Sequence, residues 1–222
     1  MLRIIPLCLV ALLTTSCVVR YKKAVDSLKA SAPCCRSVAE FKYDPFPSAG
    51  VANFKIDEAS PAFEFPTGKS FFKAFALPER STHYRLLIKS FALGQDEYAA
   101  HIFFPQLAVL DGRFRVLRQS DPADFRVGRS GLVETASASW NVLRIKVEGS
   151  VLIDDPRARY VVVYTTYDLL SGESLFDALA RVPVPVGLGK FVPIPVGFEE
   201  VGVRHSPFGV LQLNIVGDQP RR

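Results

Sequence analysis

Short segments in which apolar and polar residues alternate follow one another through most of this chain, separated by Gly, Pro and Asp. In HYRLLIKSFAL, one face of an extended strand would carry Tyr84, Leu86 and Ile88, and the other would carry Arg85, Leu87 and Lys89. A period of two residues is typical of a strand with one buried face. A chain with this pattern is expected to fold mainly into β-strands.

Turn residues and buried runs narrow the prediction to an all-β, antiparallel β-sandwich of jelly-roll type. Asp111 and Gly112 stand between two alternating runs, where Gly would accept the positive φ of a type I′ hairpin turn. The run YVVVYTTY, residues 160–167, is apolar on both faces, as expected of a central strand. Many short strands joined by such turns are typical of sandwiches and barrels. The other predicted strands include NFKIDE from Asn53, AFEF from Ala62, Ser70–Leu77, Val142–Val147 and Gly209–Ile215.

One short helix is expected inside the β region, in GESLFDALA. Leu175, Phe176 and Leu179 lie at helical spacing there, and Ser171 or Ser174 is a suitable N-cap. The sequence therefore predicts a single amphipathic helix before the last strands.

A small internal repeat follows, VPVPVG at 182–187 and VPIPVG at 192–197. Alternating Pro prevents ordinary ladder pairing by those residues and favours an extended, polyproline-like backbone. Two structures satisfy this pattern: a rigid exposed arm that docks a partner, or a long Pro-rich crossover whose valines pack on the sandwich. The crossover is the favoured prediction.

The first residues, MLRIIPLCLVALLTTSC, indicate export. Arg3 precedes an apolar run that is shorter than the ~20 residues of a membrane span. The ending LLTTSC resembles a bacterial lipobox, so residues 1–16 are predicted as a signal peptide and Cys17 as the lipid-modified N-terminus. Val18, rather than Asp, after the cysteine favours the periplasmic, inner leaflet of the outer membrane. The alternative is an ordinary signal cut near Ser16, which leaves a soluble periplasmic protein.

Three regions are predicted after the signal peptide. Residues 17–50 mix Lys, Ala, Ser and Pro without sustained periodicity and are expected to form a lipid-anchored tether, with a short helix near residues 22–30. Residues 51–217 are assigned to the β-sandwich domain, and residues 218–222 to a short tail.

Two adjacent cysteines, Cys34 and Cys35, remain in the predicted tether. Neighbouring Cα atoms lie about 3.8 Å apart, closer than in most disulfides, so a bond between them would be strained. Two free thiols or a bridge to another chain are the alternatives. The spacing gives no indication of a zinc or thioredoxin-like site, and a structural or incidental role is expected.

The charge balance gives only a weak indication of partners. Lys and Arg number 27 against 22 acidic residues, a formal net charge of +5, and losing Arg3 with the signal leaves +4. An exported protein rarely meets nucleic acid, so anionic envelope components are the acidic partners within reach. A merely soluble surface is the simpler interpretation.

Gly68-Lys69-Ser70 matches the end of a nucleotide-binding loop. The full motif has another Gly five positions before the first of these residues, and Phe63 occupies that position here. The flanking sequence predicts strand–turn–strand rather than strand–loop–helix. We therefore expect no nucleotide, with Gly68 in a turn and Lys69 in solvent.

No arrangement of residues predicts catalysis. The candidates are three histidines and two carboxylate pairs, namely His83, His101, His205, Asp154 with Asp155, and Glu199 with Glu200. The histidines lack metal-ligand spacing, and no nucleophile elbow is present. A Ser-His-Asp arrangement stays open as an alternative, because its members converge in space and not in sequence. We expect no enzyme activity, no metal and no cofactor.

Trp140, in SASWNVL, is the candidate for ligand binding. Its predicted position at the entry to a strand would let an exposed ring stack on a sugar. Packing in the core or at a sheet edge is the alternative, because aromatic side chains dominate burial.

Five segments in order, GKSFFKAFALP, YRLLIKSF, IFFPQLAVLDGRFRVLR, RYVVVYTTYDLL and SPFGVLQLNI, resemble the maltose operon periplasmic protein (MalM-like) family. The resemblance covers about residues 50–216, and Phe104–Asp111 carries most of it. It implies a non-catalytic periplasmic protein associated with carbohydrate (maltose or maltodextrin) transport, with no cofactor. The lipobox-like Cys17 departs from the ordinary cleavable signal of that family.

Overall fold

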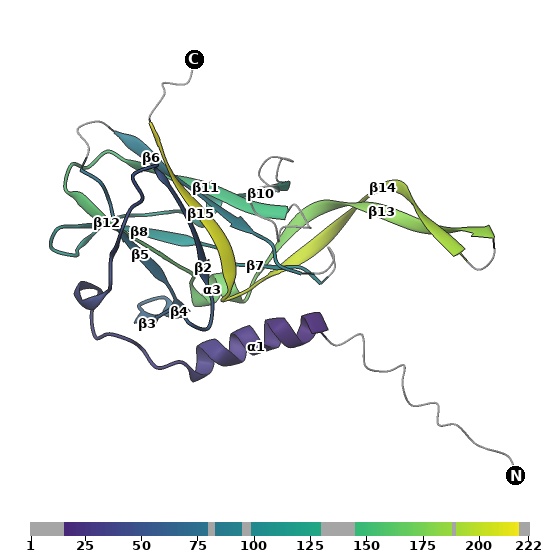
Figure 1. Ribbon diagram of the computed structural model, residues 1–222, viewed down its shortest axis with the longest axis horizontal. Coiled ribbons are helices and arrows are strands. Elements are labelled where there is room, and N and C mark those ends of the chain that lie inside the picture. The colour runs from purple at the N-terminus through teal and green to yellow at the C-terminus, as the bar shows by residue number, and fades with distance from the viewer. Residues whose placement is uncertain (1–15, 80–82, 95–98, 130–144, 188–189, 218–222) are drawn as a thin grey trace, which may run out of the picture.

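The computed structural model describes residues 16–79, 83–94, 99–129, 145–187 and 190–217 (Figure 1). The helices are α1 (Ser16–Ala30) and α3 (Tyr167–Leu170), with 3-10 turns at Val38–Glu40 and Pro122–Asp124. The strands are β1 (Asp44–Pro45), β2 (Val51–Ile56), β3 (Ala62–Phe65), β4 (Gly68–Phe71), β5 (Lys73–Ala76), β6 (Tyr84–Phe91), β7 (His101–Ile102), β8 (Gln106–Asp111), β9 (Val116–Gln119), β10 (Arg126–Arg129), β11 (Ile145–Ile153), β12 (Ala158–Tyr164), β13 (Glu173–Gly187), β14 (Lys190–His205) and β15 (Gly209–Gly217).

Two five-stranded sheets form the body of the protein. The strand order is β1-β5-β12-β8-β9 in the first sheet and β10-β11-β6-β15-β2 in the second. Apart from the parallel pair β1–β5, neighbouring strands in both sheets run antiparallel. The predicted all-β, sandwich-like fold is confirmed, and the described strands form no closed barrel.

The main core lies between these sheets. Leu86 and Ile88 of β6 are fully buried, whereas the intervening Leu87 is only half-buried, as the alternating sequence predicts. They belong to one apolar cluster with Leu107 of β8 and Val161 of β12, which come from the other sheet. Burial of this alternating face provides the main driving force for the fold.

A further layer covers the outer face of the first sheet. β3 and β4 form a separate antiparallel hairpin, and the ring of its Phe65 stacks on Tyr164 with 4.1 Å between centroids. Val162 and Tyr164 belong to this outer cluster, whereas Val161 and Val163 belong to the main core. β12 is therefore covered on both sides, in agreement with its continuously apolar sequence.

The segment predicted as a tether packs against the β domain. Ala24 and Leu28 of α1 are buried, and so are Phe41 and Phe46 farther along. Phe41 stacks on Phe72 with 4.0 Å between ring centroids. Among the described residues, no helix combines the length and apolarity needed to cross a membrane.

Lys69 differs from its predicted solvated position. Its ammonium group donates hydrogen bonds to the carbonyl oxygens of Lys29 at 3.0 Å and Ser31 at 2.7 Å. A cation at the C-terminal end of a helix satisfies free carbonyls and complements the helix dipole. Lys69 therefore fixes α1 to the β3–β4 hairpin, and Gly68, with φ +107°, forms the predicted turn.

The predicted hairpin after Asp111 is present between β8 and β9. The residue with positive φ is Phe114 at +60°, not Gly112, so the predicted turn geometry is wrong. The Asp111 carboxylate accepts hydrogen bonds from the amides of Arg113 and Arg115 at 2.8 and 2.9 Å, and the Phe114 ring stacks on Tyr160. These contacts place the left-handed residue two positions later than expected.

The helix predicted in GESLFDALA is also wrong. These residues begin β13, in which Ser174, Phe176 and Ala178 are buried and Leu175 is exposed. The short helix α3 lies just before, where the Thr166 hydroxyl accepts a hydrogen bond from the Leu169 amide. Pairing with β14 decides the outcome, because the local apolar spacing fits both a helix and a strand.

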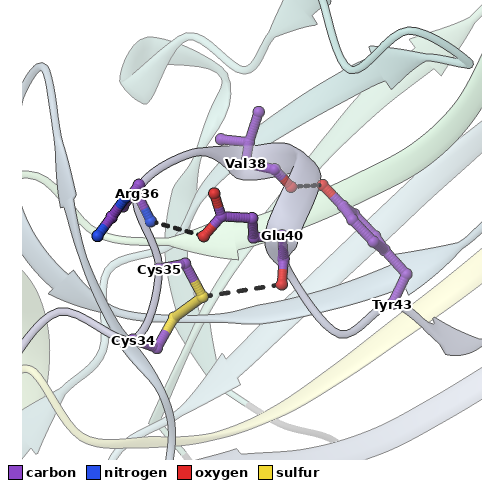
Figure 2. The surroundings of a disulfide bond; sticks show 6 residues. All are labelled: Cys34, Cys35, Arg36, Val38, Glu40 and Tyr43. Atoms are coloured by element: carbon purple, nitrogen blue, oxygen red, sulfur yellow. Dashed lines mark hydrogen bonds between the residues drawn. A yellow bond between two sulfur atoms is a disulfide. The ribbon is translucent and has the colours of Figure 1, made fainter.

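Cys34 and Cys35 form a disulfide within an irregular segment (Figure 2). The segment is held by hydrogen bonds from the Arg36 amide to the Glu40 carboxylate and from the Tyr43 hydroxyl to the Val38 carbonyl (Figure 2). Of the predicted alternatives, the bond between neighbours is the one that the structure contains.

Candidate functional site

The hairpin of β13 and β14 projects away from the sandwich (Figure 1). Its pairing runs from Glu173–Arg204 at the base to Gly187–Lys190 at the far end. We call its outer half, Val182–Gly187 with Lys190–Phe198, the arm. The favoured prediction of a crossover packed on the sandwich is wrong, because the two proline repeats pair with each other instead.

The prolines of the arm occupy alternate positions along each of its two strands. Pro183 pairs with Pro193, and Pro185 and Pro195 lie two residues away on their own strands. A residue without an N–H fits an antiparallel ladder where its nitrogen points away from the partner strand. The prolines therefore leave the ladder bonds to the pairs between them, Val182–Ile194 and Val184–Val192, and remove N–H donors from both outer edges.

Both faces of the arm are apolar and exposed. Paired residues share a face, so Val182, Val184, Val192 and Ile194 form an aliphatic face, with exposed fractions of 36–46%. Pro183, Pro185 and Phe191 lie on the opposite face, where Phe191 is 63% exposed. Val196 and Phe198 are 60% and 73% exposed. Contiguous exposed apolar surface of this kind marks an interaction site.

The inner half of the same hairpin is anchored firmly. Phe176, Ala178, Val201 and Val203 are buried in a second apolar cluster, together with Ile145 and other residues at the end of the second sheet. The strand β7 adds parallel to β14 beside this cluster. The arm is therefore an extension of an element that is packed at its base.

A serine–histidine pair lies beside this base. His205 Nε2 lies 2.8 Å from Ser174 Oγ, and Nδ1 hydrogen-bonds the Leu169 carbonyl oxygen. The carbonyl requires a proton on Nδ1, so Nε2 accepts from the serine hydroxyl. Burial lowers the pKa of His205 below its ordinary 6.5, against the opposing effects of that backbone hydrogen bond and the Glu173 charge.

The geometry of this pair suits structure rather than hydrolysis. Ser174 is 7% exposed and His205 5%, which leaves no room for a substrate at the hydroxyl. A backbone carbonyl also replaces the carboxylate that orients histidine in a catalytic triad. The pair fixes the start of β13 to the end of β14.

A cavity of about 420 Å³ lies at the end of the first sheet. Its lining comprises Asp111, Gly112, Arg113, Arg115, Arg157 and Arg159. Arg115 contacts the Asp111 carboxylate at 2.8 Å, and Arg157 contacts Asp155 at 2.7 Å. Hydrogen bonds from the Arg115 amide, then from the Arg113 amide, hold the pKa of Asp111 below its usual range. This is an ion-pair network without a nucleophile.

The family described as maltose operon periplasmic protein precursor (MalM) matches residues 67–215. The chain belongs to the MalM family. The match covers more than half of the chain and includes the arm, most of both sheets and the serine–histidine pair. It identifies the chain as a periplasmic protein of the maltose operon family. Neither the curated proteins nor the solved structures contain a match to this chain.

In the described part of this MalM-family protein, no three His, Cys, Asp or Glu residues come together as a metal site. Trp140 lies outside the described residues, so sugar stacking there stays a prediction. The backbone of Cys17 lies in the first turn of α1, and its acylation also stays a prediction. His83 is exposed, and His101 is buried beside Tyr21. The carboxylate pairs lie far apart along the chain, Asp154 and Asp155 in the lining of a second, smaller cavity and Glu199 and Glu200 in β14.

Sequence reasoning gave the exposed arm only as the less favoured alternative and did not predict its hairpin pairing. It missed two structural roles, the serine–histidine pair and the helix contact of Lys69. Only the hairpin has a local signal, because two near-identical repeats flank a glycine-containing segment and can therefore pair. The other two depend on contacts between residues more than 30 positions apart.

Proposed function

We propose that this MalM-family protein is a non-catalytic lipoprotein of the periplasm, an accessory to carbohydrate uptake that acts by binding through its arm. Acyl chains on Cys17 would hold it at the inner leaflet of the outer membrane. The apolar, exposed and rigidly based arm is the observation that supports a binding role. Buried Ser174 and His205, with their structural contacts, favour binding over hydrolysis.

Uptake of labelled maltodextrin by cells tests this proposal. Replacing residues 182–197 with a Gly/Ser linker removes all of the arm except Phe198 and keeps the base of the hairpin. We expect a severalfold slower uptake with unchanged amounts of protein, whereas Val116→Ser, an exposed change on β9, leaves uptake intact. Normal uptake without the arm would refute the proposal. An equal loss in Ser174→Ala, with unchanged thermal stability, would favour chemistry at the serine–histidine pair.

Acylation is tested separately by mass spectrometry of the processed N-terminus. The wild-type protein should carry acyl groups on Cys17, and Cys17→Ala should carry none and leave the membrane fraction. An unmodified cysteine in the wild type would support the soluble alternative.

A further inference from the structure

We propose that the arm binds the lipid surface of the membrane that carries the protein, as a second point of attachment beside the acylated Cys17. This inference deepens the proposed function and depends on it for the side of the membrane that the arm meets. The binding partner is a leaflet containing anionic lipid, contacted at the boundary between headgroups and acyl chains.

The start of α1 and the arm lie on the same side of the protein. The Tyr21 ring in α1 lies 6.3 Å from the ring of His101, and His101 pairs with Arg204 at the base of the hairpin. Cys17 precedes Tyr21 by about one helical turn, roughly 6 Å. Figure 1 shows the first turn of α1 pointing to the side from which the arm projects. A leaflet holding the acyl chains of Cys17 is therefore within reach of the arm.

The composition of the arm fits lipid on both of its faces. A groove in a partner protein would cover one face, but the aliphatic face and the Pro–Phe191 face are both apolar and exposed. Between Ala178 and Glu199 the sequence contains two cations, Arg181 and Lys190, and no carboxylate. Cations near a surface of anionic lipid attract it, by about fivefold in affinity for each residue.

The proline pattern determines how such a hairpin can enter the interface. An open sheet edge exposes unpaired N–H and C=O groups, which the hydrocarbon interior excludes. Four prolines remove N–H donors from the outer edges, although Phe191, which pairs with Pro185, keeps its own. The cost of partial dehydration is therefore reduced. The carbonyl groups of the prolines still point outward and need water. The arm is therefore suited to shallow insertion and not to deep burial.

The length of the arm agrees with contact to a single leaflet. Residues 182–187 extend about 20 Å as a strand, whereas the hydrocarbon core is about 30 Å thick. The same prolines also prevent a partner strand from adding to either edge through a regular ladder. Side chains, not backbone pairing, must therefore make the contact.

Tryptophan fluorescence with vesicles tests the inference. The protein is residues 17–222, exported behind an exchangeable signal sequence and carrying Cys17→Ser to remove acylation. Phe191→Trp in a Trp140→Phe background places one reporter on the arm, and Val116→Trp in the same background is the matched control on β9. The vesicles contain phosphatidylcholine with phosphatidylglycerol, and acyl chains brominated close to the headgroup.

We expect the emission of the Phe191→Trp variant to shift to shorter wavelength and to be quenched by the brominated lipid, while the control reporter changes in neither respect. Replacing Val182, Val184, Val192 and Ile194 together with Ser should weaken vesicle binding at least about tenfold. The same replacement of three exposed valines outside the arm, Val51, Val116 and Val216, should leave binding unchanged. Circular dichroism should show that each variant is folded.

The outcomes separate this inference from the proposed function. Unchanged arm fluorescence, or equal quenching of both reporters, refutes lipid binding by the arm. If uptake still depends on the arm in that case, the proposed function stands and the partner is a protein. If the arm binds vesicles but its replacement leaves uptake normal, the membrane contact stands and the role in uptake is refuted.

Discussion

The two halves of the β13–β14 hairpin share one ladder and yet differ in the burial of their apolar side chains. In the inner half, Phe176 and Val203 are buried while their neighbours face solvent. In the outer half, apolar residues cover both faces and are exposed. The comparison shows that an apolar strand need not be a core strand. A continuously apolar sequence produces a buried strand in β12 and an exposed one in the arm, and neighbouring layers decide between them.

The largest expected difference between the halves is in stability. Phe176→Ala should lower the free energy of unfolding by about 3–5 kcal/mol, because it leaves a cavity in a packed cluster. Phe198→Ala, at a position that is 73% exposed, should change it by less than about 0.5 kcal/mol. Urea denaturation measures both. A loss above about 2 kcal/mol for Phe198→Ala would show that the arm packs on another part of the protein.

The second test concerns pH, and it applies to the inner half alone. Since the pKa of folded His205 is below 6.5, the unfolded state binds more protons as the pH falls below 6.5. The contribution of His205 to the free energy of unfolding is then fully present above pH 6.5. It decreases on acidification, by at most about 1.4 kcal/mol per pH unit for one group. Denaturation at pH 7, 6 and 5 measures the slope, and His205→Gln should reduce it.

Exposed His83→Gln provides the matched control and should retain the wild-type slope. A slope that is unchanged in His205→Gln would assign the pH dependence to other groups.

A third test asks what the prolines of the outer half contribute. Pro183→Val with Pro193→Val restores N–H donors to both edges, and the free energy of unfolding should change by less than about 1 kcal/mol. Self-association should increase, because a bare strand edge is a template for another strand. Sedimentation velocity across a concentration series measures it, with Val182→Thr and Ile194→Thr together as a control that keeps the proline pattern. Monomeric behaviour of the valine variant would contradict the protective role.

The smallest effect on stability is expected at the disulfide. Breaking it tests whether a cross-link contributes to stability as burial does in the inner half of the hairpin. Cys34 and Cys35 are adjacent, so their bond closes no loop and barely restricts the unfolded chain. Reduction, or Cys34→Ser with Cys35→Ser, should lower the free energy of unfolding by less than about 1 kcal/mol. Thermal melting with and without reductant measures this, and a larger loss would give the bond a structural role beyond its own segment.

The body of the fold could be predicted from sequence where the pattern was local. Alternation in β6 and the doubly apolar run of β12 gave the correct element type, because a two-residue period determines which side chains share a face. The turn after Asp111 was located correctly, although side-chain hydrogen bonds and ring stacking placed its left-handed residue at Phe114.

The start of β13 could not be predicted in this way. Leu175, Phe176 and Leu179 fit a helix and a strand equally, and the partner that resolves the choice, β14, lies about 25 residues later. The same holds for the candidate site. Proline chemistry indicated an extended backbone, but not that the two repeats would pair and project into solvent.

The sequence alone determined the strand-rich composition and the family resemblance, since both depend on residue types at fixed short spacings. Tertiary structure alone decided that Ser174 meets His205, that Lys69 caps α1 and that the Pro-Val repeats form an arm. The physical reason is that burial and long-range pairing depend on which surfaces the rest of the chain supplies, and a short window of sequence contains no information about those surfaces.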